Sequence, residues 1–359
     1  MVTSSDPGLE LSQALDGRRA ALAEAVTERH YELQPELARR YGPAGRAKCR
    51  QDAGFHLSYL AEAIATSSPA LFADYVAWAK VMLAGRRIPA EDLARNLEVL
   101  CEILRRELPG DMADLACGYV EAGLERLPEL PAELPSLLVD GEPHGEMARI
   151  YLEALLRGER HVASRMVLDA VAQGTPVRDL YLHVFQPCQH EVGRLWQMNR
   201  LSVAQEHYCT AAAQLIMSQL YPYVFTGEKN GRTLLATCVS GDLHEIGVRM
   251  VTDFLEMEGW NTFYLGADTP TPSLLQTLEE RGVDVLAVSA TITSHIRSVA
   301  SLIAAVRGTE AGRRVKILVG GYPFNVDPGL WRQVGADAFA RDAQEAVAMA
   351  KRLADGGAL

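Results

Sequence analysis

The sequence predicts a multidomain protein in which two helical regions precede a doubly wound α/β domain. From residue 232 onward, short apolar and β-branched runs alternate with helical patterns, as in a parallel sheet with crossover helices. Residues 1–126 and 145–225 show the helical period alone, and a proline-rich run separates these two regions. With 359 residues, the chain is long enough for several domains with hydrophobic cores of their own.

The N-terminal region, residues 1–126, is predicted to be a bundle of five or six helices. Gln34-Pro35 ends the first helical pattern, and Gly42-Pro43 precedes the second. No repeat is visible, so the pattern favours a globin-like bundle of crossed helices, with an antiparallel bundle as the alternative. The predicted helices cover residues 9–31, 46–65, 70–84, 89–107 and 111–127.

Residues 127–144 are predicted to form a stiff linker, because three prolines between residues 127 and 135 prevent a continuous helix. After the linker, residues 145–225 are predicted to form a four-helix domain. Pro187 is expected to kink or divide its third helix, and Ser202 with Gln205 has the spacing of a capping box that starts the fourth.

The C-terminal region, residues 232–359, is predicted to be a flavodoxin-like sheet of five parallel strands with intervening helices. In such a sheet, ligands bind beyond the carboxyl ends of the strands. The predicted strands are residues 234–240, 262–265, 285–289, 315–320 and 338–340.

The composition narrows the class of partner and the compartment. A net charge of −11 and a pI near 5.4 argue against duplex DNA or an anionic membrane as the main partner. The six cysteines lie singly, as expected for reduced thiols and not for a disulfide framework. No apolar run reaches the length of a membrane span or forms a secretory leader. We therefore expect a cytoplasmic protein that binds neither DNA nor membrane.

A polar turn after the first predicted strand carries Asp242, His244 and Gly247 in the spacing Asp-x-His-x-x-Gly. A histidine on a strand-to-helix loop is well placed to ligate a metal at the edge of the sheet. An aspartate two residues earlier can fix the tautomer of the imidazole and raise its basicity. Two more polar or glycine-containing segments, Ser289-Ala-Thr291 and Gly320-Gly321, end the third and fourth strands. Small residues there leave room for a long ligand.

This ordered set resembles the cobalamin-binding domain shared by methionine synthase, corrinoid methyl carriers and cobalamin photoreceptors. The resemblance covers residues 232–359. It implies that His244 replaces the cofactor's own base as the lower ligand of cobalt, with Asp242 behind it. It further implies that the displaced nucleotide tail of the cofactor enters the edge of the sheet. Apart from Asp242, the residues implied to contact cobalamin are Ser240, Gly241, Gly247, Ser289, Thr291, Gly320 and Gly321.

The four-helix region contains Trp196, nine further residues and then Glu206-His207. This spacing resembles the Trp-x9-Glu-His motif of the adenosylcobalamin photoreceptors. The resemblance implies that these side chains cap the upper face of the cofactor and hold its adenosyl group. An indole covers an adenine-sized plane, and a carboxylate accepts hydroxyl or amino hydrogen bonds. The chain departs from the family at Gln197, where light-dependent repressors have a histidine that ligates cobalt after illumination. Other histidines that could replace it are His183, His190 and His207.

The order of the regions along the whole chain resembles the photocobilins, which carry biliverdin in an N-terminal helical domain beside cobalamin. A linear tetrapyrrole needs basic groups for its propionates, an acid or imidazole for its nitrogens, and aromatic walls. Candidate contacts, with Cys49 as a possible thioether, are Arg46, Cys49, Asp52, His56 and Tyr59. Two alternatives stay open for this region: a protein-interaction bundle, and a haem domain with His30 or His56 as the ligand.

Together these resemblances predict a cytoplasmic light sensor without enzymic catalytic residues. Light would break the cobalt–carbon bond of adenosylcobalamin, move the helical cap and change the assembly of a homo-oligomer or the binding of a separate effector protein. Biliverdin would extend absorption to longer wavelengths. The main alternative is a corrinoid methyl-carrier subunit of a methyltransferase system. A further alternative is a regulator that responds to haem or cobalamin.

Overall fold

The computed structural model describes residues 7–139, 141–225 and 227–356. These residues form two compact units. One holds the described residues up to Glu133 together with Ile292–Arg297, and the other holds the rest. The predicted fold class is confirmed: a helical N-terminal region, a four-helix region and a five-stranded parallel sheet follow one another along the chain. None of the described helices combines the length and apolar character needed to cross a membrane.

The N-terminal region contains five α-helices in its described residues and ends in a short 3₁₀ turn, η1 (Leu127–Glu129). The second helix begins ten residues earlier than predicted, because Gly42 and Pro43 kink it without ending it. Gly42 has φ of +63° there, a conformation that glycine adopts at little cost. The helices are α1 (Pro7–Leu33), α2 (Glu36–Ala65), α3 (Pro69–Gly85), α4 (Ala90–Glu107) and α5 (Gly110–Arg126).

The four-helix region, called the cap below, has its third helix divided as predicted at Pro187. The proline cannot donate a backbone hydrogen bond, and a π-helical turn, η2 (Tyr181–Phe185), lies directly before α9. The predicted capping box of Ser202 and Gln205 is present at the start of α10. The helices are α6 (Gly145–Leu156), α7 (Arg160–Ala172), α8 (Val177–Leu180), α9 (Gln186–Gln197), α10 (Val203–Gln219) and α11 (Tyr221–Val224).

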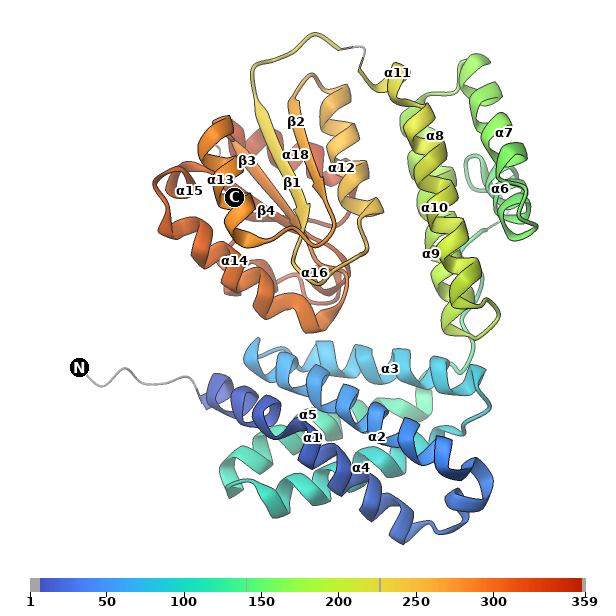
Figure 1. The fold of residues 1–359 in the computed structure, drawn as a ribbon, viewed down its shortest axis with the longest axis vertical. Coiled ribbons are helices and arrows are strands. Elements are labelled where there is room, and N and C mark those ends of the chain that lie inside the picture. Colours follow the sequence, from blue (N-terminus) through green and yellow to red (C-terminus); the bar gives the residue numbers. More distant parts are fainter. Residues whose placement is uncertain (1–6, 140, 226, 357–359) are drawn as a thin grey trace. The chain divides into compact units, whose positions relative to one another are not determined.

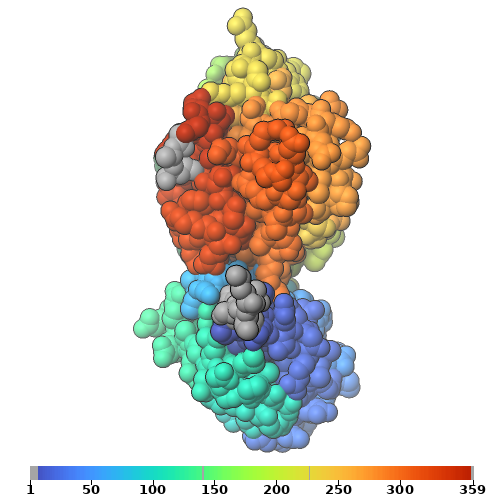
Figure 2. All heavy atoms as spheres, turned by 90° about the vertical axis from the view of Figure 1, so that its left-hand side faces the viewer, coloured from blue at the N-terminus to red at the C-terminus, as the bar shows by residue number. Residues whose placement is uncertain are grey.

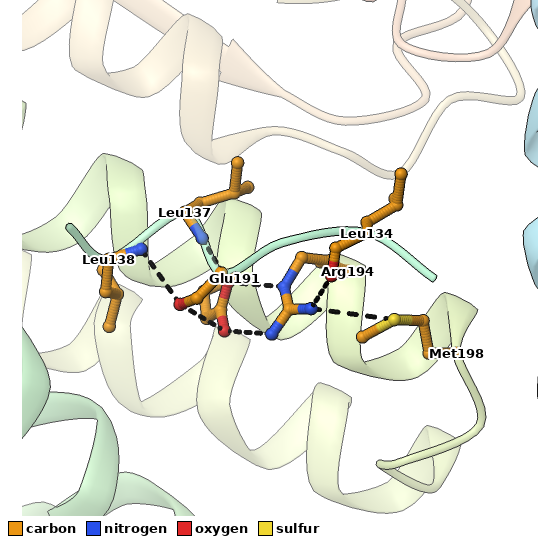
Figure 3. Close-up of polar contacts among 7 residues, drawn as sticks. Leu134, Leu137, Leu138, Glu191, Arg194 and Met198 are labelled. Carbon is orange, nitrogen blue, oxygen red and sulfur yellow. Dashed lines mark hydrogen bonds and ion pairs between the residues drawn. The ribbon is translucent and has the colours of Figure 1, made fainter. Parts of the chain in front are cut away.

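The linker is fastened to α9 by a buried ion pair (Figure 3). Arg194 donates two hydrogen bonds to Glu191, of 2.6 and 2.7 Å, and a third of 2.6 Å to the Leu134 carbonyl. The Glu191 carboxylate also accepts from the Leu137 amide at 2.9 Å and from the Ser136 hydroxyl at 3.1 Å. Burial by itself raises the pKa of Glu191, but these donors outweigh it and lower that pKa overall. The pair thus sets the path of the chain into the cap.

The sheet has strand order β2-β1-β3-β4-β5 with every pairing parallel, the flavodoxin-like arrangement that the sequence predicts. Its strands are β1 (Thr233–Cys238), β2 (Asn261–Gly266), β3 (Val285–Ser289), β4 (Lys316–Gly320) and β5 (Ala338–Ala340). Between and after them lie α12 (Ile246–Met257), α13 (Thr271–Arg281), η3 (Thr293–His295), α14 (Ile296–Gly308), α15 (Glu310–Arg314), α16 (Tyr322–Val326), α17 (Leu330–Gln333) and α18 (Ala343–Ala354).

The cap and the sheet share one hydrophobic core. Buried side chains of η2, α12 and α18 belong to the same cluster, which includes Tyr181, Phe254 and Ala350. The cap helices lie on the side of the sheet that carries α12 (Figure 1). In the space-filling view, the orange segments around residues 270–310 and the red C-terminal helix form an outer surface of the sheet domain (Figure 2). The candidate site residues lie at and just beyond the carboxyl ends of the strands.

Candidate functional site

The three motifs that follow β1, β3 and β4 meet at one edge of the sheet. Cys238 is in register with Ser289, and Ser289 is in register with Gly320. Beyond the strands, the Val239 amide donates to the Ser289 carbonyl at 3.0 Å, and the Ala290 amide donates to the Gly320 carbonyl at 3.1 Å. Parallel strands place their carboxyl ends together, so segments about fifty residues apart in the sequence become neighbours.

Asp242 is fully buried and organises the loop between β1 and α12. Its Oδ1 accepts the backbone N–H of His244 at 3.0 Å and lies 2.8 Å from the Nδ1 of the same histidine. Its Oδ2 accepts the backbone N–H of Thr291, which belongs to the segment after β3. A single carboxylate therefore orients the imidazole and joins the ends of β1 and β3.

His244 presents its second ring nitrogen outward. Nδ1 donates to Asp242, so Nε2 carries the free lone pair, and no residue in the described part of the chain forms a hydrogen bond with it. The side chain is 58% exposed. The hydrogen bond to Asp242 raises the pKa of His244 above its ordinary value, against the opposite effect of burial. The arrangement is that of an imidazole prepared to bind a metal through Nε2.

The glycines of the edge serve two different purposes. Gly321 has φ of +109°, and a Cβ there would lie 2.0 Å from the Ala290 carbonyl oxygen, so the fold itself requires glycine. Gly320 is less crowded, since its Cβ would lie 3.1 Å from the nearest carbonyl oxygen. Gly247, in the first turn of α12, has no atom within 4 Å of a Cβ position. The protein's own packing does not explain Gly247, whereas a bound group passing over the helix end would.

The loop after β2 supports the turn before Asp242. Asp268 Oδ1 accepts hydrogen bonds from the Gly241 amide at 2.8 Å and from the Ser240 hydroxyl at 3.0 Å. These two donors, the Gly241 amide first, lower the pKa of the exposed Asp268 carboxyl. Gly241 itself has φ of +86°, which favours glycine at this turn. Ser240 and Gly241 thus reach the predicted edge, held there by an acid that the motif does not contain.

The cap contributes Glu206, in the first turn of α10. Glu206 lies close enough to His244 to raise its pKa electrostatically. Its Oε1 accepts from the Thr210 hydroxyl at 2.9 Å, and its Oε2 lies 3.4 Å from Nε2 of His207, whose side chain is 74% exposed. Trp196 is half-buried at the end of α9 and packs against the shared core.

The histidines that could replace the one missing at Gln197 are placed differently. Gln197 itself is 8% exposed. His183 is half-buried beside His144, with ring centroids 6.2 Å apart, and His190 is exposed. His207 is adjacent to Glu206, and its Nε2 lies 3.4 Å from the Glu206 carboxylate.

Glu245 also takes part in the hydrogen bonds around the site, and the sequence motif does not reveal this. It follows His244 directly and accepts hydrogen bonds from Gln214 of α10, from the Tyr264 hydroxyl at the end of β2, and from the Ala267 amide. A glutamate at the start of a helix is common on electrostatic grounds alone, so no local signal marks its contacts.

These features fit a site in which His244 supplies one axial ligand to a metal that is otherwise held by a macrocyclic cofactor. Within the described residues, no three histidine, cysteine or acidic side chains are grouped so as to hold a metal ion by themselves. His244 offers one unpartnered nitrogen. Its chain neighbour Leu243 is 74% exposed, and in the described structure Gly247, three residues later, has room at its Cβ position.

Comparison with known proteins agrees with this site. A family described as a B12 binding domain matches residues 232–350, and a second family with the same description matches residues 147–221. The dimethylamine corrinoid protein of Methanosarcina barkeri is 30% identical over 164 residues, which are 45% of this chain and 74% of that protein. The chain belongs to the cobalamin-binding corrinoid proteins.

Further relatives bear on the same part of this corrinoid protein. Dimethylamine corrinoid protein 3 of Methanosarcina acetivorans is 32% identical over 127 residues, 35% of this chain and 58% of that relative. The solved structure of the monomethylamine corrinoid protein of Methanosarcina barkeri has a TM-score of 0.52 at 23% identity, and the match covers 58% of this chain and 98% of that one. That likeness establishes the shared fold. Both family matches begin after residue 146, so neither includes the N-terminal helices.

In the N-terminal region, the five residues predicted to contact a bilin all lie on α2. Asp52 and His56 are one turn apart, and Tyr59 stacks on Tyr75 with ring centroids 4.0 Å apart. The Tyr75 hydroxyl is hydrogen-bonded to Nδ1 of the buried His56 at 2.7 Å, and the Trp78 ring stacks on Tyr75 with centroids 6.3 Å apart. Burial lowers the pKa of His56 to about 4 and raises that of Asp52 to about 6. In the described chain, Asp52 has no hydrogen bond or ion pair.

The remaining candidates on this helix are engaged elsewhere. The Arg46 guanidinium lies 5.4 Å from the centre of the Tyr31 ring. Cys49 accepts from Asn96 at 3.4 Å, and burial raises the pKa of its thiol to about 11, so little thiolate is present for a thioether. Both ring nitrogens of His30 form hydrogen bonds, to Gln34 at 2.7 Å and to Asn96 at 2.9 Å. His30 is therefore unsuited to be a haem ligand.

Proposed function

We propose that this corrinoid protein binds cobalamin with His244 as the lower ligand of cobalt, and that it serves as the methyl-carrying subunit of a methyltransferase system. The observation that carries the proposal is the Asp242–His244 pair, with a buried carboxylate behind an imidazole whose Nε2 has no partner in the described chain. The printed names of the relatives, dimethylamine and monomethylamine corrinoid proteins, support the carrier role.

The roles of the chain's own residues follow from this placement. His244 binds from below, and Asp242 keeps its proton on Nδ1 and its lone pair on Nε2. Ser240, Gly241, Ser289 and Thr291, with Gly320 and Gly321, line the strand edge where a nucleotide tail would enter. When bound, cobalamin supplies a cobalt centre that accepts and releases an alkyl group. No side chain is proposed as an enzymic catalyst.

A carrier needs access to the upper side of its cofactor. Glu206 and His207 are the cap residues that we propose border this side, and their side chains are 29% and 74% exposed. This exposure supports an upper side that a separate methyltransferase can approach. The partner would be a soluble protein, in keeping with the acidic charge of the chain.

Reconstitution with methylcobalamin tests the proposal. We expect a His-on absorption spectrum. After photolysis to the cob(II)alamin form, we expect an electron paramagnetic resonance spectrum with nitrogen coupling from one imidazole. His244→Ala should lose the nitrogen coupling. Methyl transfer from the loaded protein to a thiol acceptor, catalysed by an added methyltransferase, would support the carrier role. Loaded protein that keeps its methyl group with every methyltransferase offered would count against it.

The second candidate is a light sensor that binds adenosylcobalamin. The specific observation in its favour is Glu206, which stands in the predicted Trp196-x9-Glu206-His207 spacing and is close enough to His244 to contribute, after Asp242, to the raised pKa of that histidine. Biliverdin in the N-terminal region belongs to this candidate. The unpaired Asp52 carboxylate beside His56 and the stacked rings of Tyr59, Tyr75 and Trp78 support it.

Illumination separates the two candidates. Green light cleaves the cobalt–carbon bond of bound adenosylcobalamin in either case, so the oligomeric state, and not the visible spectrum, separates the candidates. The oligomeric state should change on illumination if the chain is a photoreceptor that signals by assembly. A sedimentation profile unchanged by light, in protein whose spectrum shows that the bond has been cleaved, would exclude that photoreceptor. Added biliverdin should give a red-shifted band that Asp52→Asn weakens, whereas a Soret band with bound iron would point to haem instead.

A further inference from the structure

Glu245 uses both oxygens of its carboxylate to connect three parts of the molecule. Oε1 accepts a hydrogen bond of 2.8 Å from Nε2 of Gln214, in the middle of cap helix α10. Oε2 accepts from the Tyr264 hydroxyl at 2.8 Å and from the Ala267 amide at 3.0 Å, both on the sheet side. Hydrogen bonds to an ionised carboxylate are about twice as strong as neutral ones. One side chain thus holds the cap, the end of β2 and the loop after it.

The position of Glu245 gives these bonds a direct route to the cobalt ligand. It is joined to His244 by a peptide bond, and its own carbonyl accepts the Arg249 amide at 3.0 Å, which starts α12. The His244 backbone is held from the other side by Asp242. The short loop that carries His244 is therefore held at both ends, so a shift of the Glu245 side chain should move it.

In the described residues, the other hydrogen bonds between cap and α12 are made by residues farther along that helix. Arg249 donates to the Gln214 carbonyl at 3.2 Å and to the Ser218 hydroxyl at 2.8 Å. Tyr181 donates to Asp253 at 2.8 Å, and Arg178 pairs with Glu258 at 2.7 Å. These contacts hold the cap to the helix. The Gln214–Glu245 bond differs because it ends on the residue next to His244.

We propose that Glu245 is a positioning residue that makes docking of cap helix α10 and the conformation of the His244 loop depend on each other. The proposal rests on the proposed role of His244 as the cobalt ligand. Suppose that a docked cap favours the loop conformation in which His244 binds the cofactor. By linkage, cofactor bound through His244 then favours the docked cap by the same factor. A cap that opens for exchange of the upper group would then weaken the hold on the lower side.

The first test uses the cofactor-free protein and two matched variants of α10. Gln214→Ala removes the bond to Glu245, whereas Ser218→Ala removes a hydrogen bond to Arg249 one turn later. Amide hydrogen exchange is measured by mass spectrometry over residues 243–247. We expect exchange there to rise about fivefold or more in Gln214→Ala and to stay at the wild-type rate in Ser218→Ala. Equal rates in all three proteins, or an equal rise in both variants, would overturn the proposal.

The second test uses protein loaded with cob(II)alamin. The fraction of cobalt with nitrogen coupling is measured by electron paramagnetic resonance in wild type, Gln214→Ala, Glu245→Ala and Glu245→Gln. We expect the ratio of His-on to His-off cobalt to fall about fivefold or more in the two alanine variants and to recover partly in Glu245→Gln. Wild-type ratios throughout would refute the coupling. Absence of nitrogen coupling in wild type would instead refute the assignment of His244 as the ligand. The amide-exchange measurement would then still test whether Glu245 connects the cap with the loop.

Discussion

Replacing Asp242 by asparagine tests the site at its most constrained point. The substitution keeps the size of the side chain but replaces one acceptor oxygen by an NH2 group. In the structure, the carboxylate accepts from two backbone amides and from Nδ1 of His244, and it is fully buried. At least one of these three donors would then face another donor. A buried donor without an acceptor costs about 1–3 kcal/mol, and more when the lost acceptor was charged.

Two effects are therefore expected of Asp242→Asn. The free energy of unfolding of the cofactor-free protein should fall by about 2–4 kcal/mol, since one or two amide donors lose a charged acceptor. Cobalamin affinity should fall by about 10–100-fold, because the imidazole loses the partner that orients it. The pKa of His244, raised by this hydrogen bond, should also return towards its ordinary value.

Urea unfolding followed by circular dichroism measures the first effect, cobalamin titration the second, and NMR titration of the imidazole the third. His244→Ala is the matched control: its side chain is 58% exposed, so stability should change by less than about 1 kcal/mol while axial ligation is lost. An Asp242→Asn protein with wild-type stability and a wild-type His-on spectrum would refute the reasoning.

Three further predictions concern the glycines, the N-terminal acid and the linker. Gly321→Ala should lower the free energy of unfolding by about 2–4 kcal/mol, because its Cβ would meet a carbonyl oxygen at 2.0 Å. Gly247→Ala should instead stabilise α12 by up to about 1 kcal/mol and weaken cobalamin binding. Equal effects of the two substitutions in urea unfolding and in cobalamin titration would contradict this prediction. Burial raises the pKa of Asp52 to about 6, so the native state binds more protons between about pH 4 and 6 and stability falls as pH rises through that window. Asp52→Asn should add about 1–3 kcal/mol at pH 8 and little at pH 4, and a pH-independent difference between the unfolding curves would count against the assignment. Arg194→Met leaves Glu191 buried without its partner and should lower the free energy of unfolding by about 3–5 kcal/mol at pH 7. This loss should shrink as the pH falls through the lowered pKa of Glu191. A loss below about 1 kcal/mol in urea unfolding would show that the pair is dispensable.

Much of the local structure could be predicted because its signals are short in range. The capping box of Ser202 and Gln205 and the strand Val285–Ser289 depend on neighbours within a few residues. The kink at Gly42 was predicted as a helix boundary, because a glycine and a proline indicate a disturbed helix but not whether the helix resumes on the same axis.

The candidate site divides in the same way. The Asp242-x-His244 spacing places both groups on one turn, so their contact is implied by three consecutive residues. The Thr291 amide that completes the carboxylate's bonds comes from another strand end, 49 residues away. Its approach could be anticipated only because parallel strands align their carboxyl ends.

The sequence by itself determined the fold class and the residues that reach the carboxyl edge of the sheet, because periodicity, turn residues and strand order are encoded locally. The tertiary structure alone showed that Gln214 meets Glu245, that Asp268 supports Gly241 and that Glu191 and Arg194 hold the linker. Glu191 and Arg194 are three residues apart on one helix, but the contact of Arg194 with the linker spans 60 residues and that of Gln214 with Glu245 spans 31, and no spacing rule predicts either. Which distant side chains meet depends on how whole helices pack, and that packing is set by the shared core of cap and sheet. The sequence thus identifies His244 as the proposed ligand, whereas the contact of its neighbour Glu245 with the cap is seen only in the fold.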